Sequence, residues 1–270
     1  MKILDTFAGI GGFSYAAEQL VGGFTTTQFI EINPYCQKIL KKHWPHVPIH
    51  DDIKTFTAKS GEFDIITGGF PCQDISVAGL QAGITKETRS GLFFELMRVI
   101  RMVRPKYIVL ENVAAILNRG LDIVLRELSQ AGYDAEWAVI SASSVGACHQ
   151  RSRWWLVAYP SSFSRKQKSK IQTRRNTIIR SSITNSNSKG MERRIEPINQ
   201  EMQKTRLTWQ SDTPHLSPEW RSYVSEPVLR RRNDGLRSRM DRLKALGNSI
   251  VPQVAAIPLQ RVKDLYATFT

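Results

Sequence analysis

Short apolar runs alternate with amphipathic stretches over the first 159 residues of this 270-residue chain. Apolar residues at helical spacing predict amphipathic helices, and short apolar runs are typical of strands buried in a parallel sheet. Strands that alternate with helices along a chain favour a sheet with helices on both faces. The pattern therefore predicts a doubly wound, mostly parallel α/β sheet.

The expected elements follow one another without an internal repeat. Strands are expected at residues 2–7, 26–32, 63–67 and 107–110, with a short strand ending at Asp52 and a closing hairpin of 137–140 with 154–158. Helices are expected at residues 13–21, 34–43, 92–103, 121–131 and 254–266. Proline in the first turn of a helix, and proline or glycine just beyond its end, support these bounds.

The net charge of +14 is concentrated in one part of the chain. Residues 160–243 hold 19 lysines and arginines against 8 acids, whereas residues 1–159 hold 16 against 15. Such a segment favours a lobe that binds a polyanion, and the alternative is a solvated, loosely ordered insert. Because the apolar pattern resumes near residue 243, we expect a discontinuous main domain of residues 1–159 and 244–270 around a lobe of residues 160–243.

Composition argues against several classes of protein. The apolar runs fall far below the ~20 residues that span a bilayer, and the first residues show no signal-peptide pattern. Three cysteines cannot form a disulfide framework. The sequence contains no C-x-x-C pair, the spacing that would indicate a zinc site. We therefore expect a monomeric cytoplasmic protein with free thiols and no metal.

A glycine-rich turn, Asp5-Thr6-Phe7-Ala8-Gly9-Ile10-Gly11-Gly12, joins the first expected strand to the first helix. Its glycines permit a tight turn and the close approach of a ligand. Glu31 ends the second strand, where a carboxylate can accept both hydroxyls of a ribose, and Asp52 can accept from an adenine amino group. The glycines lack G-x-G-x-x-G spacing, which favours a nucleoside without a diphosphate, such as S-adenosylmethionine. The alternatives are a simple turn and solvated acids.

A second turn, Gly68-Gly69-Phe70-Pro71-Cys72-Gln73, follows the strand at 63–67. It lies where open α/β sheets bind ligands, beyond the carboxyl ends of the strands. Glycines and a proline hold the thiol in a shaped turn, so Cys72 is interpreted as a nucleophile, whereas Cys36 is interpreted as a core residue and Cys148 as structural. Glu111 ends the next expected strand, and a carboxyl beside a thiol is typical of a reaction centre.

These motifs, together with Glu111-Asn112-Val113, Arg151-Ser152-Arg153 and Gly247-Asn248-Ser249, resemble in order and spacing those of the cytosine-C5 DNA methyltransferase family of bacterial or phage type. The resemblance covers residues 1–159 and 243–262. It implies a Rossmann-like methyltransferase sheet that binds S-adenosylmethionine and releases S-adenosyl-L-homocysteine. One departure is that His149, rather than Gln150, aligns with the glutamine of the family's Q-x-R-x-R motif.

The resemblance also implies a role for each matching residue. Cys72 attacks C6 of a cytosine flipped out of duplex DNA, Glu111 recognises the base, and Arg151 and Arg153 contact the flipped nucleotide. The implied cofactor-binding residues are Phe7, Gly9, Gly11, Gly12, Glu31, Ile32, Asp52, Ile53, Pro71, Leu92 and Asn248.

The resemblance to this family implies duplex DNA as the partner. We therefore expect the protein to be bound to DNA in the cytoplasm. Residues 74–90 are expected to form a mobile loop that closes over the flipped base. The expected DNA contacts are Gln73, Gln81, Arg89, Arg230, Arg231, Arg232, Arg237 and Arg239. A cognate restriction endonuclease is a further partner of such enzymes.

Two other hypotheses compete with a DNA methyltransferase. One is the RNA-directed branch of the family, which acts on transfer RNA, although its Cys-Phe-Thr signature is absent from this chain. The other is a non-catalytic DNA-binding regulator that kept the fold. Loss of Cys72 or of the glycine turn would support a regulator, but both are present.

Overall fold

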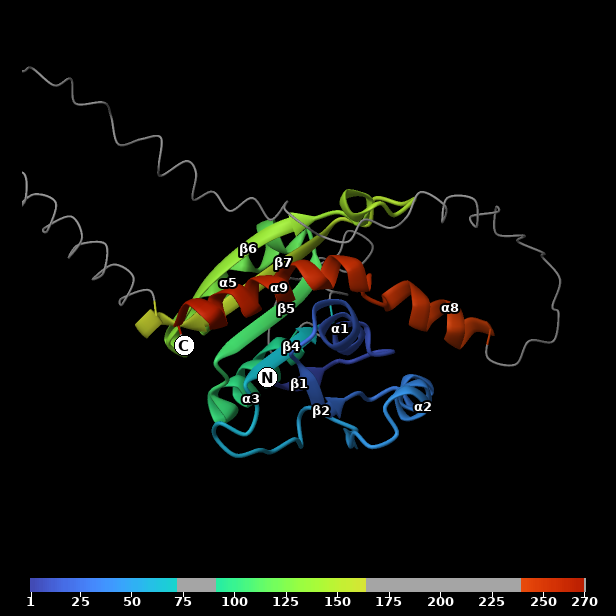
Figure 1. Cartoon of the computed structure of the whole chain (residues 1–270), viewed down its shortest axis with the longest axis horizontal. Helices are drawn as coiled ribbons and strands as arrows, with labels where there is room; N and C mark the ends of the chain where they lie inside the picture. Colours follow the sequence, from blue (N-terminus) through green and yellow to red (C-terminus); the bar gives the residue numbers. More distant parts are fainter. Residues whose placement is uncertain (72–90, 164–238, 270) are drawn as a thin grey trace, which may run out of the picture. The chain divides into compact units, whose positions relative to one another are not determined.

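A computed structural model of the chain describes residues 1–71, 91–163 and 239–269 (Figure 1). Seven strands form one sheet in the order β3-β2-β1-β4-β5-β7-β6. In chain order these strands are β1 (Lys2–Thr6), β2 (Thr25–Ile30), β3 (Ile49–His50), β4 (Ile65–Gly69), β5 (Tyr107–Val113), β6 (Tyr133–Ile140) and β7 (Arg153–Pro160).

The sheet is parallel from β3 to β5, and β7 is inserted antiparallel between β5 and β6. The chain passes from β1 to β2 on one side and later to β4 on the other side of β1. The carboxyl end of β1 is therefore the point at which the strand order reverses, and open α/β sheets bind ligands at such a point.

Helices cover both faces of the sheet, as predicted. The described helices are α1 (Gly12–Tyr15), η1 (Ala16–Val21), α2 (Pro34–His43), α3 (Leu92–Val103), α4 (Ile116–Arg119), α5 (Leu121–Gln130), η3 (Ala142–Val145), α8 (Arg239–Asn248) and α9 (Pro252–Phe269). Helix α9 lies across β5 and β7 on the same side as α1 (Figure 1). The apolar faces of α3 and α5 pack into the main core on the opposite face. The predicted doubly wound, mostly parallel α/β fold is thus confirmed.

Two helices have the bounds that the sequence predicts, because their ends are set locally. Asn33 caps α2, and its side chain accepts a hydrogen bond from Tyr35 N at 2.9 Å, next to Pro34 in the first turn. Helix α3 ends at Val103, and the next residue, Arg104, adopts a left-handed conformation with φ 51° immediately before Pro105. Proline disfavours the helical conformation of the residue before it, so the helix stops there.

Strand ends differ more from the prediction. β5 continues through Glu111 to Val113 because β7 pairs with it from Ile108 to Val113. The predicted strand ending at Asp52 ends at His50, since Asp52 turns the chain by accepting Lys54 N at 3.0 Å on its side chain. The expected single helix at 13–21 consists of a short α segment followed by the π-helical η1.

The two tryptophans of β7 fill both sides of the sheet. Trp154 belongs to the core shared with α3 and α5, whereas Trp155 meets the ring of Phe13 from α1 edge-on at 5.8 Å. Both indoles are almost completely buried. Successive strand residues point to opposite faces, so this pair anchors one helix layer on each side of β7.

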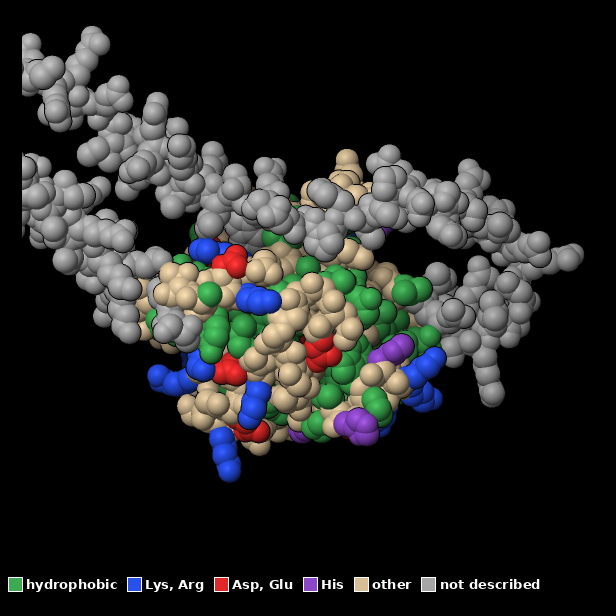
Figure 2. Space-filling view, viewed as in Figure 1, with side chains coloured by type: hydrophobic (Ala, Val, Ile, Leu, Met, Phe, Trp, Pro, Cys, Tyr) green, Lys and Arg blue, Asp and Glu red, His purple; other side chains and the backbone are tan. Residues whose placement is uncertain are grey.

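None of the helices in the described ranges is long and apolar enough to cross a membrane. On the face shown in Figure 2, acidic and basic side chains of the described residues lie intermixed, several of them next to one another. That distribution agrees with the nearly balanced charge of residues 1–159.

A buried carboxyl group ties the centre of the fold together. Asp5 of β1 is fully buried, and it accepts hydrogen bonds from Ser14 Oγ of α1 at 2.7 Å and from Thr67 Oγ1 of β4 at 2.8 Å. Burial raises the pKa of Asp5 from 3.8 to about 7, against the lowering effect of both hydroxyls. Folding therefore favours the protonated form of this group.

We predict that Asp5 makes the protein less stable as pH rises. Between pH 4 and 7 the unfolded chain loses the Asp5 proton while the folded chain keeps it, so the free energy of unfolding falls by up to ~4 kcal/mol. Asp5→Asn removes this ionisation. In urea titrations at pH 4.5 and 7.5, the free energy of unfolding of the Asp5→Asn variant should therefore increase relative to that of wild type as the pH rises. The exposed Asp122→Asn control should keep the wild-type dependence. Parallel curves for wild type and Asp5→Asn would contradict the assignment.

Candidate active site

The glycine turn after β1 opens directly onto the main pocket. Phe7 and Gly9 both have left-handed backbones, with φ 53° and 56°. A methyl group added at Gly9 would meet nothing within 4 Å, so this stretch of backbone is accessible to a ligand. Gly9 N donates to Glu31 Oε2 at 2.7 Å, which links the turn to the end of β2.

The next two glycines have a packing role. A Cβ atom at Gly11 would lie 2.6 Å from the Trp44 ring, and one at Gly12 would lie 3.1 Å from Ile250 Cβ. Neither residue lines the main pocket. Because these two residues have no side chains, the start of α1 can pack closely against Leu40 and Trp44 at the end of α2 and against Ile250 in the α8–α9 connection.

Glu31 is held in a single orientation by the backbone around it. Its two carboxylate oxygens accept Gly9 N at 2.7 Å and Asn33 N at 2.8 Å. Burial raises the pKa of Glu31, and these two backbone hydrogen bonds act in the opposite direction. Each oxygen of a carboxylate has two acceptor sites, so both can still accept a hydroxyl of a ligand.

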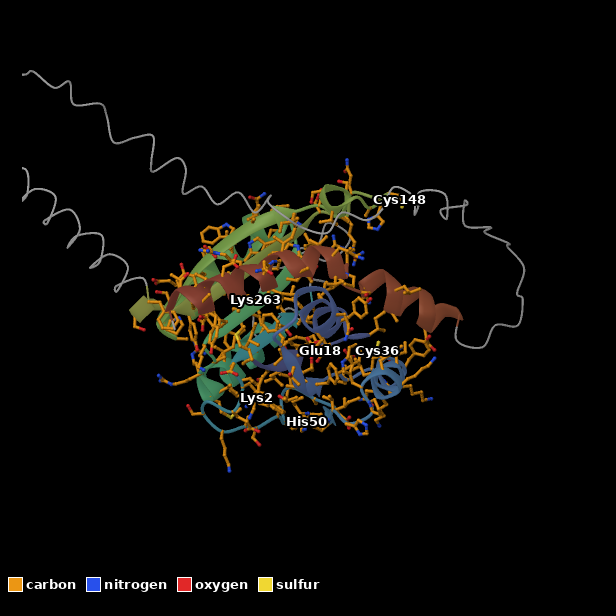
Figure 3. The ribbon with its side chains drawn as sticks, in the orientation of Figure 1. Lys2, Glu18, Cys36, His50, Cys148 and Lys263 are labelled. Atoms are coloured by element: carbon orange, nitrogen blue, oxygen red, sulfur yellow. The ribbon has the colours of Figure 1, made fainter. Side chains whose placement is uncertain are left out.

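One pocket of about 290 Å³ joins the turn, Glu31 and the end of β5. Of the residues assigned to the cofactor or to catalysis, it is lined by Phe7, Gly9, Glu31, Pro71, Glu111, Arg151, Arg153 and Asn248. Asn33 and Cys36 also line it, the latter from α2 (Figure 3). Cys36 is buried, which confirms its interpretation as a core residue, and it forms part of the pocket wall as well. The sequence does not single out Asn33, because a helix-capping residue shows where α2 begins but not which side of it meets a cavity.

The remaining cofactor assignments do not line this pocket. Ile32 is 70% exposed, directly after Glu31, which is unusual for a large apolar side chain. Ile53 is buried, and its carbonyl accepts Arg98 Nη2 from α3 at 2.6 Å, which fixes the segment that carries Asp52. Leu92 packs against the main core at the start of α3.

Glu111 is the acid at the inner end of the pocket. Its neighbours in register are Gly69 of β4 and Trp155 of β7, and Arg153 Nε lies 3.1 Å from its Oε1. Burial raises the pKa of Glu111 to about 7, whereas the positive charges of Arg153 and Arg151 act to lower it. A carboxyl group with that pKa can donate a proton or a hydrogen bond at neutral pH.

The turn that leads to Cys72 is anchored from β5. Asn112 is buried, donates from Nδ2 to Phe70 O at 3.1 Å and accepts Val113 N on Oδ1 at 2.8 Å. These bonds fix the backbone two residues before Cys72 relative to Glu111, its neighbour in sequence. Asn112 belongs to the Glu111-Asn112-Val113 motif, but the sequence alone indicates no role for it.

Arg151 joins the start of β7 to the chain that returns after α8. Its Nη2 donates to Ser249 O at 2.8 Å, and its backbone has φ 33°. Ile250 follows, and its side chain meets both Gly12 and Gly69. The connection from α8 to α9 thus packs against the start of α1 and against Gly69 and Arg151 of the pocket wall.

Several predicted site residues lie outside the described residues, and for Arg239, the first residue of α8, only the backbone is described. The predicted loop at 74–90 and residues 164–238 of the predicted basic lobe also lie outside the described residues. The site residues concerned are Cys72, Gln73, Gln81, Arg89, Arg230, Arg231, Arg232 and Arg237.

Comparisons with known proteins agree with this arrangement. The Type II methyltransferase M.CviJI of Paramecium bursaria Chlorella virus IL3A is 36% identical over 160 residues, which cover 58% of this chain and 42% of that protein. M.NlaX of Neisseria lactamica is 35% identical over 163 residues, with 58% and 52% covered. The S. pombe Dnmt2 methyltransferase structure matches with a TM-score of 0.50 at 25% identity, over 59% of this chain and 49% of that one.

The chain spans about half the length of the curated relatives it matches. A family model described as C-5 cytosine-specific DNA methylase matches residues 1–245, which include every motif quoted above except Gly247-Asn248-Ser249. That match includes Gly69, Phe70 and Pro71 after β4 and Glu111 of β5, which line the same pocket. The chain therefore belongs to the C-5 cytosine-specific DNA methylase family.

Proposed function

We propose that this chain transfers the methyl group of S-adenosylmethionine to C5 of a cytosine flipped out of duplex DNA. The observation that carries the proposal is the placement of Glu111, whose pKa is raised to about 7, in the same pocket as Glu31 and the open backbone of Gly9. One end of the pocket suits a nucleoside and the other suits a base that needs a proton donor.

The residues at the nucleoside end of the pocket suit the adenosine part of S-adenosylmethionine. Glu31 would accept the ribose hydroxyls, Phe7 and the exposed Ile32 would pack against the adenine, and Asp52 would accept from its amino group. Gly9, Gly11, Gly12, Ile53, Pro71, Leu92 and Asn248 would complete the site. When bound, this cofactor supplies an electrophilic sulfonium methyl group.

The base end must make C5 of cytosine nucleophilic. The thiolate of Cys72 adds to C6 while protonated Glu111 donates its proton to N3, so the ring becomes an enamine with an electron-rich C5. After C5 is methylated, its proton passes to solvent, the electrons of that C–H bond re-form the C5–C6 double bond and expel the Cys72 thiolate, and the N3 proton returns to Glu111. Arg151 and Arg153 would contact the flipped nucleotide. The base must leave the duplex for Cys72 to reach C6.

The basic segment 160–243 is the part of the chain that we assign to DNA binding. Its excess of lysine and arginine suits phosphate contacts, which supply affinity without sequence information. We place those contacts mainly at Arg230, Arg231, Arg232, Arg237 and Arg239, with Gln73, Gln81 and Arg89 nearer the flipped base. The names of M.CviJI and M.NlaX as Type II methyltransferases support a cognate restriction endonuclease as a second partner.

Transfer of a radiolabelled methyl group tests this function. The full chain should label duplex DNA and leave transfer RNA unlabelled, and Cys72→Ser should bind cofactor but lose transfer. The target carried on a 5-fluorocytosine oligonucleotide should form an adduct that survives denaturation, because fluorine at C5 is not lost as a proton. Labelling of transfer RNA alone would reject the DNA substrate, and near-wild-type turnover by Cys72→Ser would reject the covalent mechanism.

Glu111 should determine the alkaline side of the pH–rate profile. Because N3 needs a proton donor, single-turnover transfer should decline above about pH 7 as Glu111 ionises. Glu111→Gln keeps a hydrogen-bond donor but cannot deliver a proton, so it should be slower by about a hundredfold or more and lack this decline. Rates from pH 6 to 9 decide the point, and an unchanged alkaline decline in Glu111→Gln would assign it to another group.

Glu31→Ala should weaken binding of S-adenosylmethionine by about tenfold to a hundredfold, since two charge-assisted hydrogen bonds to ribose are lost. Calorimetric titration measures the affinity, and filter binding of duplex DNA should change little. Glu62→Ala is the matched control, because Glu62 is an exposed acid away from the pocket. Equal cofactor affinity in wild type and Glu31→Ala would refute the ribose role.

A further inference from the structure

A second, much smaller cavity adjoins Glu111. It shares Glu111, Arg151 and Arg153 with the main pocket, and its other walls are Trp155, Ile250, Val251 and Val254. The space leaves about 10 Å³ for the centre of a water-sized molecule. This volume suits one water molecule and is too small for an organic ligand.

The cavity has a polar wall that the mechanism above does not use. Trp155 lies opposite Glu111 in the β5–β7 register, so both side chains leave the same face of the sheet. Its indole is 1% exposed, and its Nε1–H meets no hydrogen-bond acceptor among the described residues. The edge-on contact with Phe13 at 5.8 Å restricts the ring.

We propose that this cavity is a binding site for one structural water molecule that bridges Trp155 and Glu111. The water accepts a hydrogen bond from Trp155 Nε1–H and donates one to the carboxylate of Glu111. A bridging water needs two or more polar partners, and a cavity this small brings its lining groups within contact of a single molecule. Trp155 then acts as a positioning residue through the water, without touching the substrate.

The bridge has a consequence for the acid that the proposed function depends on. Among the described residues, the charged groups that act on Glu111 are Arg151 and Arg153, and the wall contributed by Ile250, Val251 and Val254 is apolar. A hydrogen bond donated to the carboxylate favours its ionised form. The water therefore works with the two arginines against burial and keeps Glu111 able to exchange its proton near neutral pH.

A titration of Glu111 itself tests the site without any methyl transfer. The protein is labelled with ¹³C at glutamate carboxyl carbons, the Glu111 signal is assigned with Glu111→Gln, and its shift is followed against pH in the full chain without DNA. Trp155→Phe keeps the ring but removes the N–H, so the midpoint should rise by about half a pH unit or more.

Trp154→Phe is the matched control for this titration. Trp154 is equally buried and its Nε1–H also lacks an acceptor in the described parts of the chain, but it faces the core on the other side of β7. It should leave the Glu111 midpoint unchanged. Equal Glu111 titration midpoints in wild type and Trp155→Phe would overturn the proposal. An equal rise of that midpoint in Trp155→Phe and Trp154→Phe would overturn it as well.

A high-resolution crystal structure of the unaltered chain provides a second test that needs no variant to fold. It should show one ordered water within hydrogen-bonding distance of both Trp155 Nε1 and a carboxyl oxygen of Glu111. A cavity without water, or an indole rotated to another partner, would reject the bridge. If the water and the titration shift are found but DNA is not methylated, the proposed function fails and the bridge stands.

Discussion

The arrangement of the pocket depends on the hydrogen bonds that Asp5 accepts at the carboxyl end of β1. Ser14 and Thr67 bring α1 and β4 to one buried carboxyl group, at the point where the strand order reverses. A buried acid without such partners would carry a large desolvation cost. With α1 and β4 held there, the glycine turn between β1 and α1 faces the turn between β4 and Cys72, and the space between them opens as the pocket.

The return of the chain after α8 completes that space from the far end of the sequence. Ile250 fits where Gly12 has no side chain and also meets Gly69, while Ser249 O accepts from Arg151. A segment far along the chain from the glycine turn thus packs against the start of α1 and against the part of the pocket wall formed by Gly69 and Arg151. A Cβ atom at Gly12 would lie 3.1 Å from Ile250 Cβ, so Ile250 would have to shift by a few tenths of an ångström to admit a side chain there.

Sequence reasoning predicted the parts that local chemistry decides. Helix α2 has its predicted bounds because Asn33 and Pro34 specify its start, and α3 ends at Val103 because of Pro105. Strand ends depend instead on partners far away in sequence: β5 extends to Val113 because β7 lies beside it. Cys36 is buried as predicted. Its place in the pocket wall, that of Asn33 and the role of Asn112 could not be predicted in the same way, since only the folded chain shows which side chains line the pocket or hold the turn at Phe70.

The balance of forces on Glu111 connects the fold to the chemistry. Two arginines nearby would by themselves keep this group ionised, as in an ordinary ion pair, yet burial outweighs them and the pKa rises to about 7. Burial comes from the scaffold, namely the register with Gly69 and Trp155 and the apolar chain at Ile250, whereas the arginines come from the start of β7. An acid set between these influences is about half protonated near pH 7, and in the proposed reaction it would pass its proton to N3 as addition of the Cys72 thiolate to C6 makes N3 more basic. Without the apolar wall of Ile250, Val251 and Val254, the arginines would lower the pKa of Glu111. Without Arg153, whose Nε lies 3.1 Å from Glu111 Oε1, burial would raise that pKa further.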